Sequence, residues 1–301
     1  MTDAALRPSL LPSLELEAPS SIEELTALVA RGFTPIGGGS DVLLAAAHTG
    51  SPSRLAYTGH VPEFSALEVD ATEVTIGAAV TLGRLVRADE ARSAVAAITD
   101  GAQQIGSAQL RNTATVIGNL CTASPAGDTL PGQFVHRAQV DFVDSAGSRR
   151  SVPVADFATG PGSTSLDADE IVIAVRVEAC GPNEGSAYRR FTERNAIDLA
   201  FAGVAARVAF EEDEQTVRSL HLALGAVGPT VVDASREGAA LLGGPLTAER
   251  VAEVAATAAA SCSPISDHRC SADFRRQLIR VLTIEAIDDA ASRARERQGR
   301  P

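Results

Sequence analysis

The spacing of apolar and polar residues changes several times along the chain and predicts a mixture of helices and strands. The sequence Ser21-Ile22-Glu23-Glu24 is a capping box, and Ile22, Leu25, Leu28 and Val29 form one apolar face behind it, so a helix is expected up to Gly32. Short apolar, β-branched runs predict strands at 33–36, 55–58, 73–77, 140–143, 151–154 and 169–177, and a helical pattern covers 81 to about 98. Residues 1–19 carry three prolines and predict an extended lead-in.

The turn cluster Cys180-Gly181-Pro182-Asn183-Glu184-Gly185 is the best candidate for a domain boundary. Beyond it, strands are expected at 188–191, 201–210 and 216–225, followed by helices at 232–242, 247 to about 260 and 271 to about 293. The pattern therefore predicts two domains, 1–180 and 185–295, the first of them divided into subdomains of about 1–58 and 59–180.

Composition narrows the class of partner. The 301 residues are 45% hydrophobic and carry a formal net charge of −12, which argues against nucleic acid or an anionic membrane surface as a partner, because both require a basic footprint. The N-terminus lacks the basic and apolar regions of a signal peptide, and no run approaches the ~18 apolar residues of a membrane span. We therefore expect a cytoplasmic protein whose partners are other proteins.

Side chains that hold metals or act in catalysis are dispersed. Cys121, Cys180, Cys262 and Cys270 form no Cys-x-x-Cys pair, so free thiols in a reducing compartment are expected. The five histidines suggest no Ser–His–Asp or Cys–His set, and 267–270 (Asp-His-Arg-Cys) holds too few ligands at a useful spacing. We predict no catalytic side chain and no metal site on this chain.

Residues 103–128 are rich in small and hydroxyl side chains and show neither the helical nor the strand period. They predict a long ordered loop, and ordered loops of this length are usually functional. Glycine and Ser/Thr allow a backbone to approach a ligand closely, and N–H groups that point into one concavity bind anions such as a pyrophosphate. A surface loop without a ligand is the alternative for this stretch taken alone.

A second glycine-rich stretch, 35–44, reads Pro-Ile-Gly-Gly-Gly-Ser-Asp-Val-Leu-Leu and directly follows a predicted strand. Tight turns also use such glycines, so the triplet alone is a weak signal. We expect a strand, a glycine turn and a return strand that together form a small ligand-holding subdomain.

In this order, about 75 residues apart, the two stretches resemble the medium, FAD-binding subunit of the xanthine dehydrogenase and carbon monoxide dehydrogenase family of molybdenum hydroxylases. Residues 37–42 (Gly-Gly-Gly-Ser-Asp-Val) are similar to the family's Ala-Gly-Gly-Thr-Asp-Leu. Residues 111–119 and Ser124-Pro125-Ala126-Gly127-Asp128 are similar to its Arg-Asn-x-x-Thr-x-Gly-Gly-Asn and Ser-Pro-x-x-Asp. With further likeness in 194–200 and 224–230, the resemblance covers nearly the whole chain.

The resemblance implies an α+β fold: an FAD-binding domain of the vanillyl-alcohol oxidase (PCMH) type in two subdomains, then a small C-terminal α/β domain of the CO dehydrogenase flavoprotein type. It also implies a set of FAD-binding residues: Gly37, Gly38, Gly39, Ser40, Asp41, Ile105, Thr115, Gly118, Asn119, Asp128, Val172 and Arg190. No histidine lies in the glycine motif, so a dissociable, non-covalent FAD is expected.

Several of these residues have a plain structural alternative. Asp128 would bond to the flavin, or would only cap a turn. Ile105 and Val172 would shield the flavin ring, or would only pack in the core. Arg190 would place a cation near the flavin and favour its reduced, anionic form, or would be a solvated surface arginine.

One position departs from the family pattern. Ile117 stands where the family has the first glycine of its Gly-Gly pair, and a β-branched residue strongly disfavours positive φ. We expect the side chain to thicken the loop beside the pyrophosphate and to weaken FAD binding through backbone strain, which Ile117→Gly would relieve.

By the resemblance, the chain is the FAD-carrying electron-transfer subunit of a molybdenum hydroxylase. Electrons would come from molybdopterin through [2Fe-2S] clusters, held on a separate large subunit and a separate small subunit, and would pass to NAD⁺, a quinone or oxygen. A dimer of heterotrimers is expected. Two alternatives stay open: a stand-alone flavin reductase resembling UDP-N-acetylenolpyruvoylglucosamine reductase, and an interaction subunit that has lost FAD.

Overall fold

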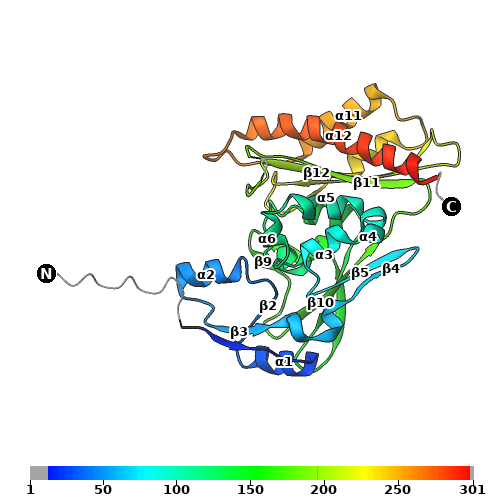
Figure 1. Ribbon diagram of the computed structural model, residues 1–301. Coiled ribbons are helices and arrows are strands. Elements are labelled where there is room, and N and C mark those ends of the chain that lie inside the picture. Colours follow the sequence, from blue (N-terminus) through cyan, green and yellow to red (C-terminus); the bar gives the residue numbers. More distant parts are fainter. Residues whose placement is uncertain (1–12, 195, 299–301) are drawn as a thin grey trace.

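The computed structural model describes residues 13–194 and 196–298 (Figure 1). Residues 1–12, most of the expected lead-in, lie outside them. The chain forms two units that lie one above the other, with the C-terminal unit at the top in yellow-green to red (Figure 1).

The N-terminal end of the first unit is a three-stranded parallel sheet in the order β1-β3-β2, which α1 covers (Figure 1). Its elements are β1 (Glu15–Glu17), α1 (Ile22–Ala30), β2 (Thr34–Ile36), α2 (Val42–Thr49) and β3 (Arg54–Tyr57). The N-cap of the expected capping box is confirmed at the start of α1, since Ser21 Oγ accepts a hydrogen bond from the N–H of Glu24 at 3.2 Å. The Glu24 carboxylate accepts the N–H of Ser20 at 2.7 Å, one residue before the position that a capping box requires.

The expected return strand after the glycine turn is wrong. The chain continues as helix α2 and only then forms β3, which pairs with β2 in parallel. A parallel partner requires a crossover connection, which a tight glycine turn cannot provide. Leucine and alanine, both strong helix formers, fill most of α2, and Gly50 ends it in the left-handed conformation at φ +74°.

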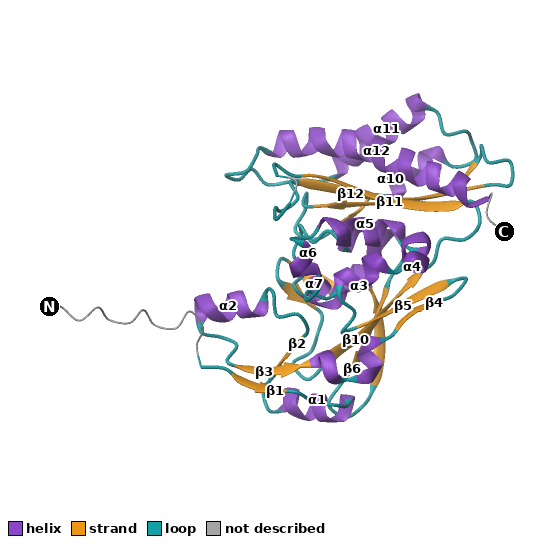
Figure 2. Cartoon of the chain, viewed as in Figure 1, coloured by secondary structure: helices purple, strands orange, loops and turns teal. Residues whose placement is uncertain are grey.

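A five-stranded antiparallel sheet, in the order β4-β5-β10-β6-β7, forms the rest of this unit (Figure 2). The apolar strand expected at 169–177 is its central strand, β10. The elements are η1 (Thr58–His60), η2 (Pro62–Ser65), β4 (Leu67–Val69), β5 (Glu73–Gly77), β6 (Gln139–Val143), β7 (Arg149–Pro153), α9 (Val154–Phe157), β8 (Ala158–Gly160), β9 (Ser163–Thr164) and β10 (Ile171–Glu178).

Helices fill the segment between β5 and β6: α3 (Leu82–Arg87), α4 (Asp89–Ala94), α5 (Ala96–Gln104), α6 (Ala108–Arg111), α7 (Val116–Cys121) and α8 (Leu130–Val135). The helix expected from 81 to about 98 is broken at Ala88 and Val95, whose backbone angles are not helical. The long loop expected at 103–128 is wrong, because it contains α6, α7 and the end of α5. Helices of four and six residues are too short for the 3.6-residue period to show, and hydroxyl N-caps at Ser107 and Thr115 start them.

The C-terminal unit is a four-stranded antiparallel sheet in the order β11-β12-β13-β14. Helices α11 and α12 cover one face of it, and α5 and α8 pack against the other (Figures 1 and 2). Its elements are β11 (Glu184–Phe191), β12 (Ala202–Phe210), β13 (Val217–Gly225), β14 (Val232–Asp233), α10 (Ser235–Gly238), η3 (Ala239–Leu241), α11 (Ala248–Ser261) and α12 (Ala272–Gln298). The single helix expected at 232–242 is wrong, because a short edge strand and two short helical turns take its place.

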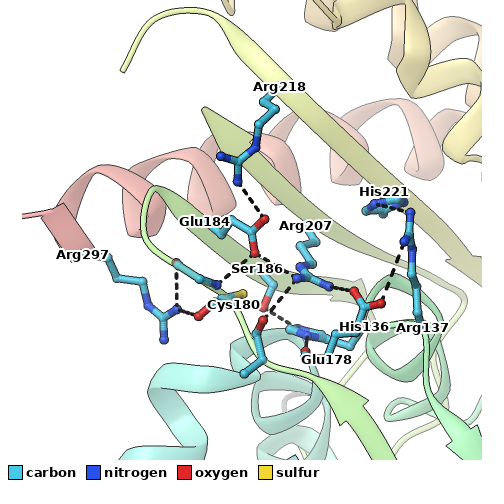
Figure 3. Close-up of polar contacts among 12 residues, drawn as sticks. His136, Arg137, Glu178, Cys180, Glu184, Ser186, Arg207, Arg218, His221 and Arg297 are labelled. Atoms are coloured by element: carbon cyan, nitrogen blue, oxygen red, sulfur yellow. Dashed lines mark hydrogen bonds and ion pairs between the residues drawn. The ribbon is translucent and has the colours of Figure 1, made fainter. Parts of the chain in front are cut away.

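A hydrogen-bonded chain joins the two units at His136 (Figure 3). Its Nδ1 lies 2.6 Å from the carbonyl oxygen of Glu178, so Nδ1 donates, and its Nε2 accepts from the Ser186 hydroxyl at 2.8 Å. The Ser186 oxygen in turn accepts the N–H of Ala97 at 3.0 Å. Burial, followed by the charge of Arg207, lowers the pKa of His136 to about 3, so the ring is neutral.

Arg207 on β12 forms a second link across the same junction (Figure 3). Its buried guanidinium donates to Glu178 at 2.8 Å and to Glu184 at 2.9 Å. Glu178 ends the central strand of the first unit and Glu184 begins the C-terminal sheet, so one cation binds both units.

The apolar core also crosses this junction. Tyr188, Ala205, Ala223 and Val231 of the C-terminal unit belong to the same buried cluster as the core of the first unit. The sheet and helices α11 and α12 enclose a second apolar cluster on the far face. Within residues 13–194 and 196–298, no helix combines the length and the apolar character that crossing a bilayer requires.

Candidate functional site

The glycine stretch after β2 forms a concavity of backbone N–H groups. Among the described residues, no protein atom accepts a hydrogen bond from the N–H of Gly38, Gly39 or Ser40. Gly39 has φ +69°, a conformation that glycine adopts without strain. Consecutive unpaired N–H groups around such a left-handed residue are a structure that binds anions.

The second stretch lies directly against the first. A Cβ added to Gly38 would stand 2.1 Å from the carbonyl oxygen of Thr113, and one added to Gly37 would stand 2.9 Å from Cγ2 of Thr115. The Thr122 hydroxyl donates to Asp41 at 3.0 Å, which joins α7 to the start of α2. Two segments far apart in the sequence thus form one continuous wall.

This wall borders a cleft of about 870 Å³, a volume within the range of small-molecule sites. Eleven of the twelve residues expected to bind the cofactor line the cleft, namely Gly37, Gly38, Gly39, Ser40, Asp41, Ile105, Thr115, Gly118, Asn119, Asp128 and Val172. The alternative of an unliganded surface loop is therefore not supported for 103–128.

Arg190 is the expected site residue that the structure does not bring to the cleft. It lies behind Asp128 with only 3% of its side chain exposed, and its Nη1 forms an ion pair with Asp128 Oδ2. Its Nη2 donates to the carbonyl oxygen of Gln104 at 2.7 Å. The solvated-surface alternative is wrong. The cation that the resemblance implies near the flavin is one whose charge Asp128 balances, and its effect on the flavin stays a prediction.

Asp128 is held from two sides. The Tyr188 hydroxyl donates to Oδ1 at 2.8 Å, and Arg190 binds Oδ2, so two residues of β11 reach across to a carboxylate of the first unit. Burial raises the pKa of Asp128 to about 6, although Arg190 and Tyr188 oppose this shift. The carboxylate is therefore mainly ionised at pH 7 and carries a fixed orientation at the floor of the cleft.

Ile117 does not have the strained backbone expected of it. It is the second residue of α7 and is not among the described non-glycine residues with positive φ, and only 5% of it is exposed within the core of the first unit. A residue inside a helical turn needs no left-handed conformation, so a β-branch is accommodated. The expected backbone strain is wrong, so the alternative of a subunit that lost FAD through such strain has no support from the backbone here. Ile117 also lines the cleft, and the effect of its side chain on FAD affinity stays a prediction.

Four further residues line the cleft without belonging to the set expected from the sequence: Arg194, Ile197, Asp198 and Leu199. The Asp198 carboxylate accepts the N–H groups of Arg194 at 3.0 Å and of Leu199 at 2.9 Å, and Ile197 has φ +53° with 65% exposure. An exposed isoleucine in the left-handed region cannot be read from sequence. The likeness of 194–200 to the family was the one available signal.

The residues present fit a flavin dinucleotide. Unpaired N–H groups at Gly38–Ser40 suit a pyrophosphate, while Ile105, Leu110 and Val172 supply apolar surface for a ring system. No histidine lines the cleft within the described residues, and no group of three His, Cys, Asp or Glu side chains there is placed to hold a metal ion. The four cysteines, all within the described part of the chain, are free thiols.

Comparisons with known proteins agree with this geometry. Residues 12–178 match the family model described as the FAD binding domain in molybdopterin dehydrogenase, and residues 186–290 match the CO dehydrogenase flavoprotein C-terminal domain. The carbon monoxide dehydrogenase medium chain of Hydrogenophaga pseudoflava is 28% identical, over 94% of this chain and 98% of its own length. The nicotine 6-hydroxylase medium subunit of Paenarthrobacter nicotinovorans is 30% identical, over 94% and 99% of the two chains.

Similarity to solved structures extends over the same length. A chain of carbon monoxide dehydrogenase from Hydrogenophaga pseudoflava superimposes with a TM-score of 0.87 at 28% identity, covering 94% of this chain and 99% of that one. Quinoline 2-oxidoreductase from Pseudomonas putida gives the same TM-score at 26% identity. The likeness therefore includes both units and the junction between them.

Proposed function

The chain belongs to the FAD-binding medium subunits of the xanthine and carbon monoxide dehydrogenase family of molybdenum hydroxylases, and from this premise we propose its part in the reaction. The chain is an electron-transfer subunit: electrons arrive from iron–sulfur clusters on a partner subunit and leave to NAD⁺, a quinone or oxygen. Bound FAD supplies the redox chemistry, because its ring system can accept electrons from one partner and release them to another.

The observation that carries the proposal is the concavity at Gly38–Ser40, whose N–H groups have no acceptor in the described protein and open into a cleft with apolar walls. These N–H groups would hold the pyrophosphate by hydrogen bonds. A non-covalent FAD is supported by the lining of the cleft, which contains no histidine among the described residues. Thr115, Gly118 and Asn119 continue the same wall, while Ile105 and Val172 exclude water from the ring.

Asp128 and Arg190 act as a pair in this proposal. Asp128 offers its remaining lone pairs to the cofactor, and Arg190 orients the carboxylate from behind. Arg190 is therefore a positioning residue, and its effect on the flavin reaches the cleft only through Asp128.

The partners we propose are a small iron–sulfur subunit and a large molybdopterin subunit, assembled as a dimer of heterotrimers in the cytoplasm. The words "medium chain" and "medium subunit" in the names of the relatives support a place between a smaller and a larger chain. The proposed division of this chain, 1–180 and 185–295, is supported by the change of sheet between β10 and β11.

The test is purification of the natural complex from its host through a tag on this chain. We expect two further subunits to co-purify, flavin absorption that denaturation releases as free FAD, and reduction of that flavin when a substrate of the complex is added. A chain that purifies alone and is active by itself on a small organic substrate would overturn the electron-transfer role. A complex without flavin would overturn the cofactor assignment.

A further inference from the structure

Asn119 lines the cleft from α7, and one edge of its amide is already occupied. Its Oδ1 accepts the hydroxyl of Thr129 at 2.6 Å, the shorter side of the usual range. Among the described residues, no protein atom accepts from its Nδ2. The amide therefore turns its oxygen to the protein and its two N–H donors towards the cleft.

Thr129 lies at a position where its hydroxyl would normally accept a hydrogen bond from the first turn of a helix. It is the N-cap of α8, and N-cap threonines commonly accept an N–H of the first turn, yet Thr129 makes no such bond. Its hydroxyl donates to Asn119 Oδ1 instead. Because the Thr129 hydroxyl bonds to a cleft residue and not to the N-terminus of its own helix, this contact points to a role outside the helix.

Gln133, one turn further along α8, fixes the direction of the Thr129 hydroxyl. Its Nε2 donates to Thr129 Oγ1 at 3.1 Å, so that oxygen is already an acceptor and its proton is directed to Asn119. Both Thr129 and Gln133 are fully buried, and Gln133 Oε1 has no partner. The chain Gln133, Thr129, Asn119 thus runs in one direction and ends in the cleft.

We propose that Thr129 is a positioning residue, which holds the Asn119 amide with its N–H donors facing an acceptor oxygen of the cofactor. This inference rests on the proposed function, since FAD is the ligand that the cleft is proposed to hold. Without the Thr129 hydroxyl the amide can rotate or turn over, and ordering it again on binding reduces the affinity.

The test uses the full chain stripped of FAD and measures FAD binding by quenching of flavin fluorescence. Thr129→Val, which removes only the hydroxyl, is expected to weaken binding about tenfold. Thr129→Ser, which keeps the hydroxyl, is expected to bind within about twofold of the parent, because the hydrogen bond persists. Asn119→Asp keeps an acceptor for Thr129 but replaces the two donors by charge, so it is expected to bind at least as weakly as Thr129→Val.

Thr283 provides a matched control. It is also a fully buried threonine, it lies in α12, and its hydroxyl has no partner, so Thr283→Val makes the same chemical change away from the cleft. It is expected to leave FAD affinity unchanged. In Thr129→Val, the Nε2 donor of Gln133 stays buried without an acceptor. The double variant Thr129→Val/Gln133→Met removes this donor as well. Its free energy of unfolding is therefore expected to recover, while its FAD affinity stays about tenfold weaker than that of the parent.

The outcomes are distinguishable. If the parent chain binds FAD and Thr129→Val binds it equally well, the inference is wrong while the proposed function stands. The inference also fails if Thr129→Ser is as weak as Thr129→Val, or if recovery of stability in the double variant restores the affinity. A parent chain that takes up no FAD would overturn the proposed function and this inference with it.

Discussion

Gly38 and Thr113 stand so close that a methyl group could not fit between them: a Cβ on Gly38 would lie 2.1 Å from the Thr113 carbonyl oxygen. The same added atom would also lie 2.6 Å from the N atom of Ala114. Two segments of the cleft wall, far apart in the sequence, touch through their backbones here. The glycine is required by this contact and not by a positive φ.

Gly38→Ala is therefore expected to push these two segments of the cleft wall apart. We expect a stability loss of about 1–3 kcal/mol, as for overpacking, and a marked loss of FAD retention. Thermal melting of the flavin-free forms and FAD titration would measure the two effects. Gly160→Ala is the control, because nothing lies within 4 Å of its added Cβ and its φ is not positive. Equal behaviour of the two variants would contradict the requirement.

Asp128→Ala is expected to destabilise the protein as well as to weaken FAD binding. It leaves Arg190, only 3% exposed, as an uncompensated buried charge, which typically costs about 3–5 kcal/mol. The free energy of unfolding from urea titration measures this loss. The double variant Asp128→Ala/Arg190→Met removes the charge as well and is expected to recover part of it. Equal losses in the single and double variants would show that the buried charge is not the cause.

His136 is expected to make the fold sensitive to acid. Its pKa is lowered to about 3 in the folded chain against 6.5 for the ordinary group, so the unfolded chain binds a proton first. Stability is then fully present above about pH 6.5 and is lost as the pH falls towards 3. Between pH 7 and pH 5 this one group removes about 2 kcal/mol.

The measurement is the difference in pH dependence between the parent and His136→Gln. Subtraction removes the contributions of other groups, including Asp128, whose raised pKa acts in the opposite direction between about pH 4 and 6. The variant is expected to be less stable at pH 7 and to lose about 2 kcal/mol less on acidification. Parallel curves for the two proteins would mean that His136 is not the acid-sensitive group.

Ile117→Gly is expected to destabilise the chain and not to tighten FAD binding. The variant removes a buried side chain, which costs about 2–5 kcal/mol, and places glycine inside a helix at a further cost of about 1 kcal/mol. Urea titration and FAD titration of the flavin-free form check this expectation. Ile117→Val, which keeps most of the packing, serves as the control. Tighter FAD binding by Ile117→Gly would restore the idea of a strained loop.

The sequence predicted the long elements well because their signals are local. A capping residue marks the start of α1 at Ser21, and an apolar run marks β10. Apolar residues at helical spacing mark α11 and α12. Helices α6 and α7 carry only one or two turns, so no period distinguishes them from a loop. Helix α2 was missed because the glycine triplet before it suggested a hairpin, and nothing local states that β3 pairs in parallel.

The features of the site also divide into those that a local stretch of sequence predicts and those that it does not. Residues that lie within one of the two motifs, such as Gly38 and Thr115, could be predicted because the residue order and spacing of each motif carry the resemblance. Contacts that join distant segments were not visible: Tyr188 on Asp128 spans 60 residues, and Arg190 on Asp128 spans 62. Thr129 directly follows a recognised motif residue, yet its role depends on which way its hydroxyl points. Only the three-dimensional structure shows the direction of this hydroxyl.

Strand β11 begins after the boundary proposed between the two units, yet it carries Tyr188 and Arg190 to a carboxylate on the other side of that boundary. The contacts of this carboxylate therefore depend on residues from both units. In a recombinant chain that joined residues 1–180 of this protein to the C-terminal unit of a relative, Asp128 would meet whatever that relative carries at the positions of Tyr188 and Arg190. An exchange of the C-terminal unit would therefore preserve both contacts of Asp128 only if the incoming unit carries a tyrosine and an arginine at the positions of Tyr188 and Arg190.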